Sequence, residues 1–433
     1  MKRVVLFLVS SAALLLIASC GSSNNSVTGP NGNVTVNAPS KLTNRAFITN
    51  QFSGNIQIVD SQNDTTAYYS ATNNNTGNST SGGTTVGNTT VGAPSAAVSI
   101  IVGGSLTMEA LRPDGAETAV YNPSSPTVTF ITNSSEASNG SVPLSGWAGM
   151  LLYSADSTKM YIPVPTAAVT NSRPGGVEIV TEATSTTTVG ITGFIPIPAA
   201  RYVAISPDGK TLMVFASNSD TMFLVDLTAT QLSPVAFTGF AAPVNAFFSS
   251  DNSTAYVINC GPECGSTAGP PSVMRFDMAS RTVTATVPVG GASVGLLKNT
   301  TLYVAGFQGG SSGTFDVVDV SAMTRTTTNP VAIGDGSHTT MAISNNNKMY
   351  IGAVNCANIT EGCLSIVDLG KNSLDTVSQP LGIVTGIQSI PNRNAMYVVE
   401  GGVLYIYDTT TGQLQSTQIA FVGALFGVVQ VDP

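Results

Sequence analysis

The chain has 433 residues, of which only 9% are charged, and its formal net charge at pH 7 is −8. Globular proteins usually carry about 25% charged residues, so Ser, Thr, Asn and Gly must supply most of the polar surface. An acidic chain with only 16 Lys and Arg lacks the basic surface that phosphate backbones require, which excludes a nucleic-acid-binding protein.

The N-terminal segment has the pattern of an export signal. Lys2 and Arg3 precede an apolar run from Val4 to Ala18, which is too short for a comfortable membrane span. Its end, Ile17-Ala-Ser-Cys20, resembles the lipobox of bacterial lipoproteins. The resemblance implies a signal peptide of residues 1–19 and a lipid on Cys20 that anchors the protein to the membrane. The alternative is an ordinary secretory signal followed by a chance cysteine.

A flexible tether is expected after the anchor. Residues 20–43 are rich in Ser, Asn, Gly and Thr, a composition typical of flexible linkers. Gly21 follows Cys20, which in enteric bacteria is compatible with sorting to the outer membrane. The resemblance therefore implies a lipid-anchored protein of the bacterial cell envelope, at the outer membrane, facing either the periplasm or the outside. No other apolar stretch is long enough to span a bilayer, so the lipid is the only membrane contact that the sequence predicts.

A repeat of 47 residues dominates the rest of the chain. Tyr303, Tyr350 and Tyr397 occur 47 residues apart in the phrases Thr-Leu-Tyr-Val, Lys-Met-Tyr-Ile and Ala-Met-Tyr-Val. A period of about 40–50 residues made of short strands is typical of a β-propeller, a ring of four-stranded blades. The same position can be followed back along the chain, which gives eight units in total, at Phe47, Val120, Tyr161, Met213, Tyr256, Tyr303, Tyr350 and Tyr397.

The sequence therefore predicts an all-β fold, a single propeller of four-stranded antiparallel blades over residues 44–433. Eight blades are expected, with seven as the alternative. The long step between the first two units contains an Asn-, Thr- and Gly-rich insertion at about residues 61–94, which is expected to be a loop and not a missing blade. The chain ends in a strand from Ala424 to Asp432 without a following unit, and the first unit lacks a leading strand. Pairing of these two ends would close the ring.

Turn signals recur within the units. Phrases such as Arg112-Pro-Asp-Gly and Ser206-Pro-Asp-Gly precede several of the repeated strands. Further along, six units carry a strand that ends in aspartate, at Asp60, Asp226, Asp277, Asp319, Asp368 and Asp408. A ring of carboxylates could indicate metal binding or acid/base chemistry. Each aspartate, however, leads into Ser, Thr, Asn or Gly residues, where its side chain can cap a turn, so we predict a structural role.

These phrases resemble the YVTN family of β-propeller repeats, which is related to lactonase-like propellers and to repeat-bearing surface-layer proteins. The resemblance rests on Tyr256-Val-Ile-Asn259, Phe47-Ile-Thr-Asn50, the Pro-Asp-Gly turns and the strand-final aspartates, and it covers the chain from about Asn44 onward. It implies a propeller, commonly of seven blades in that family. The metal-binding and catalytic constellations of lactonase-like propellers cannot be matched to residues of this sequence, so the resemblance implies no activity here.

The cysteines indicate two local disulfides. Four remain once Cys20 is assigned to the lipid, and they form two close pairs, Cys260 with Cys264 and Cys356 with Cys363. Each pair lies in the loop after the repeated strand of its unit, and in an oxidising compartment such pairs are expected to bond. A four-cysteine zinc site is the alternative, which neither spacing favours. Because short closed loops lose little entropy, we expect the disulfides to stiffen loops and to contribute modestly to stability.

Expanded loops after the repeated strands are a plausible binding surface. They comprise Val164–Gly176, Cys260–Pro271, Phe307–Gly313 and Asn355–Cys363. Neutral variation in loop length is the alternative interpretation.

The search for a catalytic site yields one candidate pocket. His338 is the only histidine, which excludes a multi-histidine metal site, and neither a nucleophile elbow nor a Gly-rich phosphate loop occurs. His338, Arg201, Trp147 and Glu109 lie in comparable stretches of four units, where they could line a small polar pocket at the mouth of the central channel. Unrelated solvated or paired side chains are the alternative. No catalytic residue, metal or cofactor is predicted.

Two function classes remain. The first is a lipid-anchored extracytoplasmic binding or scaffold module for a protein or glycan. The second is a lactonase- or hydrolase-like enzyme with its site at the channel mouth. The single histidine and the lack of clustered acids favour the first class, and the question of enzyme activity stays open.

Overall fold

The computed structural model describes most of the chain from Arg45 onward. It covers residues 25–29, 32–36, 40, 42–66, 99–166, 175–181, 188–307, 313–326, 329–356, 361–378, 381–419, 421 and 423–432. The predicted signal peptide and the lipidation site at Cys20 lie outside these residues, as do most of the predicted insertion and parts of three of the expanded loops.

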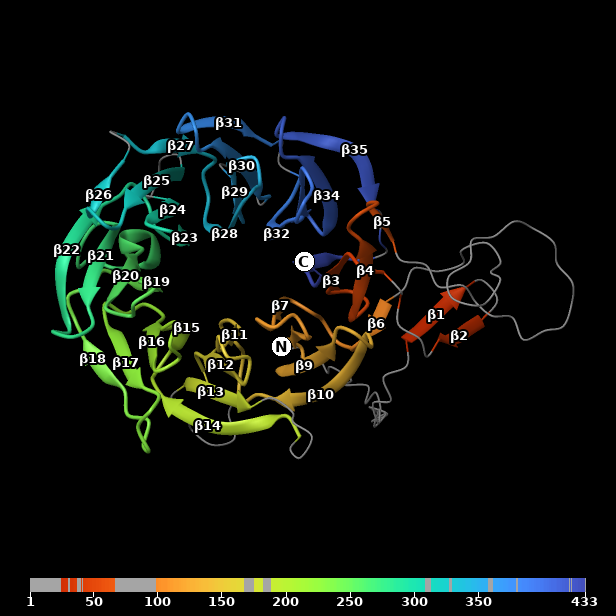
Figure 1. Ribbon diagram of the computed structural model, residues 1–433, viewed down its shortest axis with the longest axis horizontal. Coiled ribbons are helices and arrows are strands. Elements are labelled where there is room, and N and C mark those ends of the chain that lie inside the picture. Colours follow the sequence, from red (N-terminus) through yellow and green to blue (C-terminus); the bar gives the residue numbers. More distant parts are fainter. Residues whose placement is uncertain are drawn as a thin grey trace, which may run out of the picture.

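The described strands form a ring of eight antiparallel sheets (Figure 1). Each sheet is one blade with four strand positions, counted outward from the centre of the ring. All eight repeat positions found in the sequence lie on the second strand of a blade. The prediction of an all-β propeller with eight blades is therefore confirmed, and the seven-bladed alternative is wrong.

The blades are numbered in chain order. Blade 1 contains β36 (Leu425–Gln430), β3 (Arg45–Asn50) and β4 (Asn55–Asp60), with β5 (Thr65–Thr66) and β6 (Ser99–Ile101) sharing its outer edge. Blade 2 contains β7 (Met108–Leu111), β8 (Glu117–Asn122), β9 (Thr127–Thr132) and β10 (Ala137–Pro143). Blade 3 contains β11 (Leu152–Tyr153), β12 (Lys159–Val164), β13 (Gly176–Thr181) and β14 (Gly190–Pro196). Blade 4 contains β15 (Ala200–Ile205), β16 (Thr211–Ala216), β17 (Met222–Asp226) and β18 (Val235–Phe237).

The remaining four blades follow the same plan. Blade 5 contains β19 (Pro243–Phe248), β20 (Thr254–Asn259), β21 (Ser272–Asp277) and β22 (Thr282–Pro288). Blade 6 contains β23 (Val294–Lys298), β24 (Thr301–Phe307) and β25 (Gly313–Asp319), with β26 (Thr324–Arg325) and β27 (Val331–Ile333) at its outer edge. Blade 7 contains β28 (His338–Ile343), β29 (Lys348–Ala353), β30 (Cys363–Asp368) and β31 (Ser373–Val377). Blade 8 contains β32 (Val384–Ser389), β33 (Ala395–Glu400), β34 (Val403–Asp408) and β35 (Gln413–Ile419).

Two small elements lie outside this plan. Within the described residues the only helical segment is η1 (Gly261–Cys264), a single 3-10 turn. In the stretch predicted to be a flexible tether, β1 (Asn25–Gly29) pairs with β2 (Gly32–Val36). Composition did not predict this pairing, although both strands contain Val and Thr, which favour strands. None of the described helical structure has the length and apolarity needed to span a bilayer.

The C-terminal strand closes the ring, as predicted. β36 pairs antiparallel with β3, so that Phe47 lies opposite Val429 and both ends of the propeller meet in blade 1. Arg45 strengthens this junction, because its Nε and Nη2 donate to the two carboxylate oxygens of Asp432 at 2.7 and 2.8 Å. Its Nη1 donates to Glu136 of blade 2 at 2.9 Å. One buried arginine therefore joins the first blade, the C-terminal end and the next blade.

The ring has two faces, which differ in construction. The turn face carries the turns that join the first strand of each blade to the second and the third strand to the fourth. In blade 2 these two turns are hydrogen-bonded to each other, because the Asn133 N–H donates to the Ala116 carbonyl at 2.9 Å. The loop face carries the connections between second and third strands and the segments that join successive blades, as where the Gly401 N–H donates to the Ile383 carbonyl at 2.9 Å.

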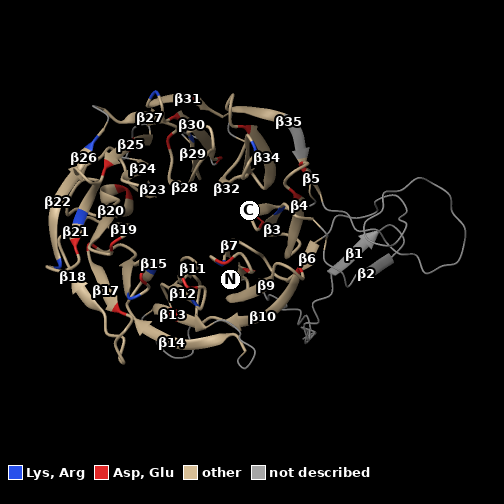
Figure 2. Cartoon of the chain, viewed as in Figure 1, with Lys and Arg blue, Asp and Glu red and all other residues tan. Residues whose placement is uncertain are grey.

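Charge is distributed unevenly between the two faces. Lys and Arg are sparse and spread around the ring (Figure 2), and the described lysines all lie at turn-face strand ends or turns, at Lys159, Lys210, Lys298, Lys348 and Lys371. The loop face instead carries the largest exposed aromatic side chains, Phe52 at 85% and Trp147 at 67% exposure.

The apolar core lies between the blades and not in one central mass. Side chains alternate along each strand, so each blade packs one face against the preceding blade and the other against the next. One such layer joins Tyr121 and Phe130 of blade 2 to Met160 and Ile162 of blade 3, all fully buried.

The six strand-final aspartates cap turns, as predicted. Asp226 is representative, because its Oδ1 accepts the N–H of Thr228 at 2.8 Å and the hydroxyl of the same residue at 2.6 Å. These bonds lower the pKa of the Asp226 carboxyl. Asp60, Asp277, Asp319, Asp368 and Asp408 each accept the equivalent backbone N–H two or three residues further on. The repeated carboxylates are therefore structural, and they lie one per blade around the turn face.

Candidate functional site

Both disulfides lie on the loop face. Cys260–Cys264 closes η1 directly after β20, and Cys356–Cys363 closes the connection between β29 and β30. The two local pairs predicted from the sequence are therefore bonded, and no zinc site is shared between them. We call the described parts of residues 217–221, 260–271 and 354–363, which belong to blades 4, 5 and 7, the cross-linked loop surface.

The blade 5 loop is held from both sides by carboxylates. Toward blade 4, Asp220 Oδ1 accepts the Ser266 hydroxyl at 2.5 Å and the Ala242 N–H at 2.8 Å. Toward blade 6, Glu263 Oε2 accepts the Phe307 N–H at 2.8 Å. Burial raises the pKa of Glu263, and the Phe307 N–H opposes that rise by stabilising the ionised form. The loop is thus fixed relative to both neighbouring blades.

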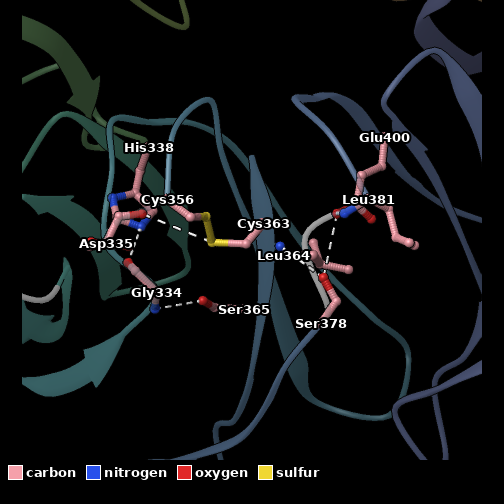
Figure 3. The surroundings of a disulfide bond; sticks show 10 residues. All are labelled: Gly334, Asp335, His338, Cys356, Cys363, Leu364, Ser365, Ser378, Leu381 and Glu400. Carbon is pink, nitrogen blue, oxygen red and sulfur yellow. Dashed lines mark hydrogen bonds between the residues drawn. A yellow bond between two sulfur atoms is a disulfide. The ribbon is translucent and has the colours of Figure 1, made fainter. Parts of the chain in front are cut away.

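The second disulfide lies between two partly buried hydrogen-bond groups (Figure 3). On one side, Ser365 Oγ accepts the Gly334 N–H at 2.9 Å. The carbonyl of Gly334 lies 3.0 Å from His338 Nε2. These contacts tie the segment that joins blades 6 and 7 to the strand that carries Cys363.

On the other side of the disulfide the contacts reach blade 8. The Leu364 N–H donates to Ser378 Oγ at 3.1 Å. Glu400 Oε1 lies 3.5 Å from that Oγ and 3.4 Å from the Leu381 N–H (Figure 3). Burial raises the pKa of Glu400 to about 7. Hydrogen bonds on both sides of the Cys356–Cys363 loop therefore connect blade 7 to blade 8 and to the segment that follows blade 6.

The exposed part of the cross-linked loop surface is almost uncharged. Its exposed residues are Asn218, Pro262, Gly265, Thr267, Ala268, Pro270, Asn355 and Glu361, and only Glu361 carries a charge. Neutral polar and small apolar groups held in fixed positions can bind a partner by shape and hydrogen bonding.

The structure places His338 between blades 6 and 7. Its side chain is only 2% exposed, its Nδ1 makes no hydrogen bond, and burial lowers its pKa to about 4, so the ring is neutral at neutral pH. The ring packs so closely on Gly313 that a Cβ there would lie 2.4 Å from His338 Cε1.

Glu109 lies at the junction of blade 2 with the closing strand. Both carboxylate oxygens are buried, and Oε1 would lie 2.5 Å from a Cβ on Gly427 of β36. Burial raises the pKa of Glu109 well above its usual range.

Arg201 and Trp147 are both exposed, and they lie in blade 4 and between blades 2 and 3. Arg201 stacks on the ring of Tyr202 in blade 4, with Cζ 5.3 Å from the ring centroid. Trp147 lies between β10 and β11. Among the described residues, no hydrogen bond or ion pair joins any two of His338, Glu109, Arg201 and Trp147. Their contacts therefore do not define a shared pocket.

A feature that the sequence did not reveal recurs where the innermost strands meet the loop face. The pairing register of the first strand shifts at its second residue in blades 4, 5, 7 and 8, at Arg201, Val244, Thr339 and Thr385. A bulge of this kind bends the strand and re-aims one side chain. No sequence signal marks these positions, because the four residues share no chemical property.

Buried acids also escaped the sequence reasoning. Glu178 Oε1 accepts the Ser145 N–H at 3.0 Å, and Asp316 Oδ2 accepts the Gly290 N–H at 2.7 Å. Both acids, like Ser365, stand three residues before the last residue of a third strand. A polar residue at that position is the signal that could have identified them as supports for the segments between blades.

Two pockets of similar size differ in chemistry. One of about 360 Å³ lies on the turn face of blades 4 and 5 and contains Asp208, Lys210, Asp226 and Arg281. The other, of about 350 Å³, lies along the innermost strands of blades 3 to 5 and has an uncharged lining. Neither contains any of the four predicted pocket residues. Within the described ranges, no group of three or more His, Cys, Asp or Glu residues could hold a metal ion.

These observations define the protein as an eight-bladed β-propeller with a cross-linked loop face. No family model matches the sequence, and no curated protein matches it.

Several solved structures share the fold. The chain is similar to dihydro-heme d1 dehydrogenase NirN in complex with DHE, at 12% identity and a TM-score of 0.65, covering 92% of this chain and 77% of that one. It is also similar to Sqt1 of Saccharomyces cerevisiae, at 10% identity and a TM-score of 0.57, covering 74% and 86%. The β-propeller domain of Myceliophteria thermophila Cps50 (Swd1) matches at 12% identity and a TM-score of 0.51, covering 71% and 98%. At these identities the likeness shows the fold alone.

Proposed function

We propose that this protein is a lipid-anchored, extracytoplasmic YVTN-type propeller that acts as a binding or scaffold module. Its cross-linked loop surface docks a protein or glycan of the bacterial cell envelope. One observation carries this proposal: the blade 5 loop is closed by a disulfide and held by Asp220 on one side and by Glu263 on the other. A surface ordered before binding avoids an entropic cost of about 0.5–1.5 kcal/mol for each flexible side chain.

The cysteines support an extracytoplasmic compartment. Two disulfides are typical of a protein that folds in an oxidising environment outside the cytoplasm. The Ile17-Ala-Ser-Cys20 phrase supports lipid attachment at the outer membrane.

A contact of Ser40 supports one orientation of the propeller on the membrane. The Ser40 N–H donates to Glu136 Oε2 at 2.7 Å, and Glu136 belongs to the turn between β9 and β10 on the turn face. The chain therefore reaches the propeller at its turn face. A lipid on Cys20 would hold that face toward the membrane and leave the loop face free for a partner.

Site-specific photo-cross-linking tests the proposal. Ordinary lysine-reactive reagents would sample the wrong face, because the described lysines lie on the turn face. We therefore suggest benzoylphenylalanine at Ala268 on the loop face, with the same group at Ala229 on the turn face as a matched control. Both alanines are exposed.

In intact cells, irradiation should produce covalent adducts with envelope proteins or glycans at Ala268 and not at Ala229. Adducts at Ala229 alone, or at neither position, would refute the loop face as the docking surface. Anchoring is tested separately, because Cys20→Ser should abolish lipid labelling and release the protein from the membrane. Unchanged labelling and fractionation of that variant would refute the lipid attachment.

A further inference from the structure

The uncharged pocket of about 350 Å³ is formed by the innermost strands of three successive blades. β11, β15 and β19 supply most of its lining, and Met150 before β11 and the turns that follow β11 and β15 supply the rest. The lining residues are Met150, Leu152, Tyr153, Ala155, Val203, Ala204, Ile205, Ser206, Pro207, Asn245, Ala246, Phe247 and Phe248. We call this the channel-wall pocket. Its volume is within the range of roughly 300–1,000 Å³ found for small-molecule sites.

The lining has an aromatic and sulfur-containing character. Phe247 and Phe248 are half-buried lining residues. The Tyr153 hydroxyl donates to Glu117 Oε1 of blade 2 at 3.3 Å, so the polar end of this side chain already has a partner. Met150 Sδ accepts the Val203 N–H at 3.2 Å, which fixes the thioether in place. Aromatic rings and thioethers both make favourable contacts with an aromatic guest.

The electrostatics restrict the ligand further. No lining residue is charged, although the chain as a whole has a net charge of −8. An ionic ligand would lose its hydration without gaining a counter-ion, which is costly. A neutral ligand pays no such penalty.

One polar group in the lining is available for recognition. Asn245 Oδ1 accepts the N–H of Ala246 at 2.8 Å, which leaves the Asn245 amide nitrogen as a donor. That nitrogen makes no hydrogen bond within the described part of the chain. A hydrogen-bond acceptor on the ligand would satisfy it.

We propose that the channel-wall pocket binds a neutral aromatic small molecule that carries a hydrogen-bond acceptor. The site is separate from the cross-linked loop surface, since it lies on the inner strands and shares no residue with that surface. The proposal therefore does not depend on a macromolecular partner.

Fluorescence titration tests this with the full chain carrying Cys20→Ser, so that no lipid or detergent is needed. The probe is N-phenyl-1-naphthylamine, a neutral aromatic dye that becomes fluorescent in apolar surroundings. Displacement by 2-acetylnaphthalene, a neutral ketone, is compared with displacement by 2-naphthoate, an anion of similar size. We expect saturable dye binding and displacement by the ketone at much lower concentration than by the anion. Absence of saturable binding, or equal displacement by the two competitors, would overturn the proposal.

The repeat supplies a plug variant with a matched control. Ala155 is an exposed lining residue in the turn after β11, so Ala155→Trp should fill the pocket without disturbing the core. Pro113 occupies the same turn position in blade 2, is also exposed and does not line the pocket. Dye binding should be lost in Ala155→Trp and kept in Pro113→Trp, with both variants melting as the parent does.

Two further variants separate this pocket from other apolar surface. Asn245→Ala should lower the affinity for the ketone roughly fivefold, as expected for the loss of one hydrogen bond. It should leave the affinity for the dye nearly unchanged. Phe52→Ser removes the most exposed aromatic ring of the loop face and should have no effect on the dye. Dye binding that survives Ala155→Trp, or disappears in Phe52→Ser, would assign the signal to another surface and overturn the proposal.

Discussion

Replacing Arg45 by methionine should weaken the closure of the ring substantially. The Arg45 side chain is 8% exposed and faces two carboxylates, of which Glu136 is fully buried and Asp432 is 19% exposed. The same guanidinium also donates to the Asn133 carbonyl at 2.6 Å. Methionine keeps much of the apolar stem and removes the charge and every donor.

The size of the effect follows from burial. Removing one partner of a buried ion pair costs about 3–5 kcal/mol, because the remaining charge stays in a poorly solvated place. Glu136 accounts for most of this, and the partly exposed Asp432 contributes less because water screens it. Conversely, Arg45→Met combined with Glu136→Gln removes both charges, so the double variant should regain a large part of the lost free energy of unfolding.

Urea unfolding followed by circular dichroism measures these differences, with a lower midpoint and an unchanged slope expected for Arg45→Met. Lys371→Met is a suitable control, because it breaks the exposed pair of Lys371 with Asp368 and should leave the midpoint unchanged. A loss below about 1 kcal/mol in Arg45→Met would place the pair in the range of exposed ion pairs and refute the reasoning. So would a double variant no more stable than the single one.

Three other predictions address the loop face and its supports. Changing all four disulfide cysteines to Ser should lower the free energy of unfolding by roughly 2 kcal/mol per bridge, because the closed loops span only 4 and 7 residues. The variant should still fold and melt cooperatively, whereas its yield of cross-linking at Ala268 should fall strongly. Collapse of the fold would contradict this. Gly313→Ala should destabilise by roughly 1–3 kcal/mol, because the new Cβ would lie 2.1 Å from the Gly334 carbonyl oxygen, whereas Gly190→Ala, with open space at its Cβ, should be harmless in the same melt. The raised pKa of Glu400, about 7, means that the folded state holds its proton more tightly than the unfolded state. The contribution of Glu400 to the free energy of unfolding is therefore complete below about pH 4.5 and is lost as the pH rises through 7. Glu400→Gln should flatten that part of the stability profile, and identical pH profiles for parent and variant would show that Glu400 does not titrate there.

The propeller could be predicted because its information is local and repeated. A tyrosine in the same short phrase every 47 residues identifies the second strand of a blade without any knowledge of tertiary contacts. The strand-final aspartates were predictable for the same reason, since each caps a turn within its own hairpin. The disulfides join cysteines only 4 and 7 residues apart.

Contacts between distant parts of the chain could not be predicted in this way. Arg45 meets Asp432 across 387 residues, and nothing near either residue indicates the other. The strand bulges depend on how an inner strand fits its neighbours, which a single strand's sequence does not encode.

The candidate pocket at the channel mouth illustrates a general property of rings. Glu109, Trp147, Arg201 and His338 were grouped because they occupy comparable stretches of their units. In a propeller, comparable stretches are distributed around the axis, one per blade, as the strand-final aspartates also are. The channel-wall pocket follows the same rule, because its lining comes from equivalent inner-strand and turn positions of blades 3, 4 and 5, which are neighbours in the ring. Equivalent positions can therefore form one site where their blades are adjacent.

The way the ring closes also determines which face is free. Blade 1 uses β36 as its innermost strand and takes β3 as its second, so the chain enters at Arg45 on the turn face, close to Asp432. Had an N-terminal strand supplied the innermost position, a chain entering at its start would have arrived on the loop face, which also carries the disulfides. The observed closure places Arg45 on the turn face, and Ser40 also contacts that face through Glu136. Under the proposed function, a lipid on Cys20 and a partner on the loop face would therefore not compete for one face of the ring.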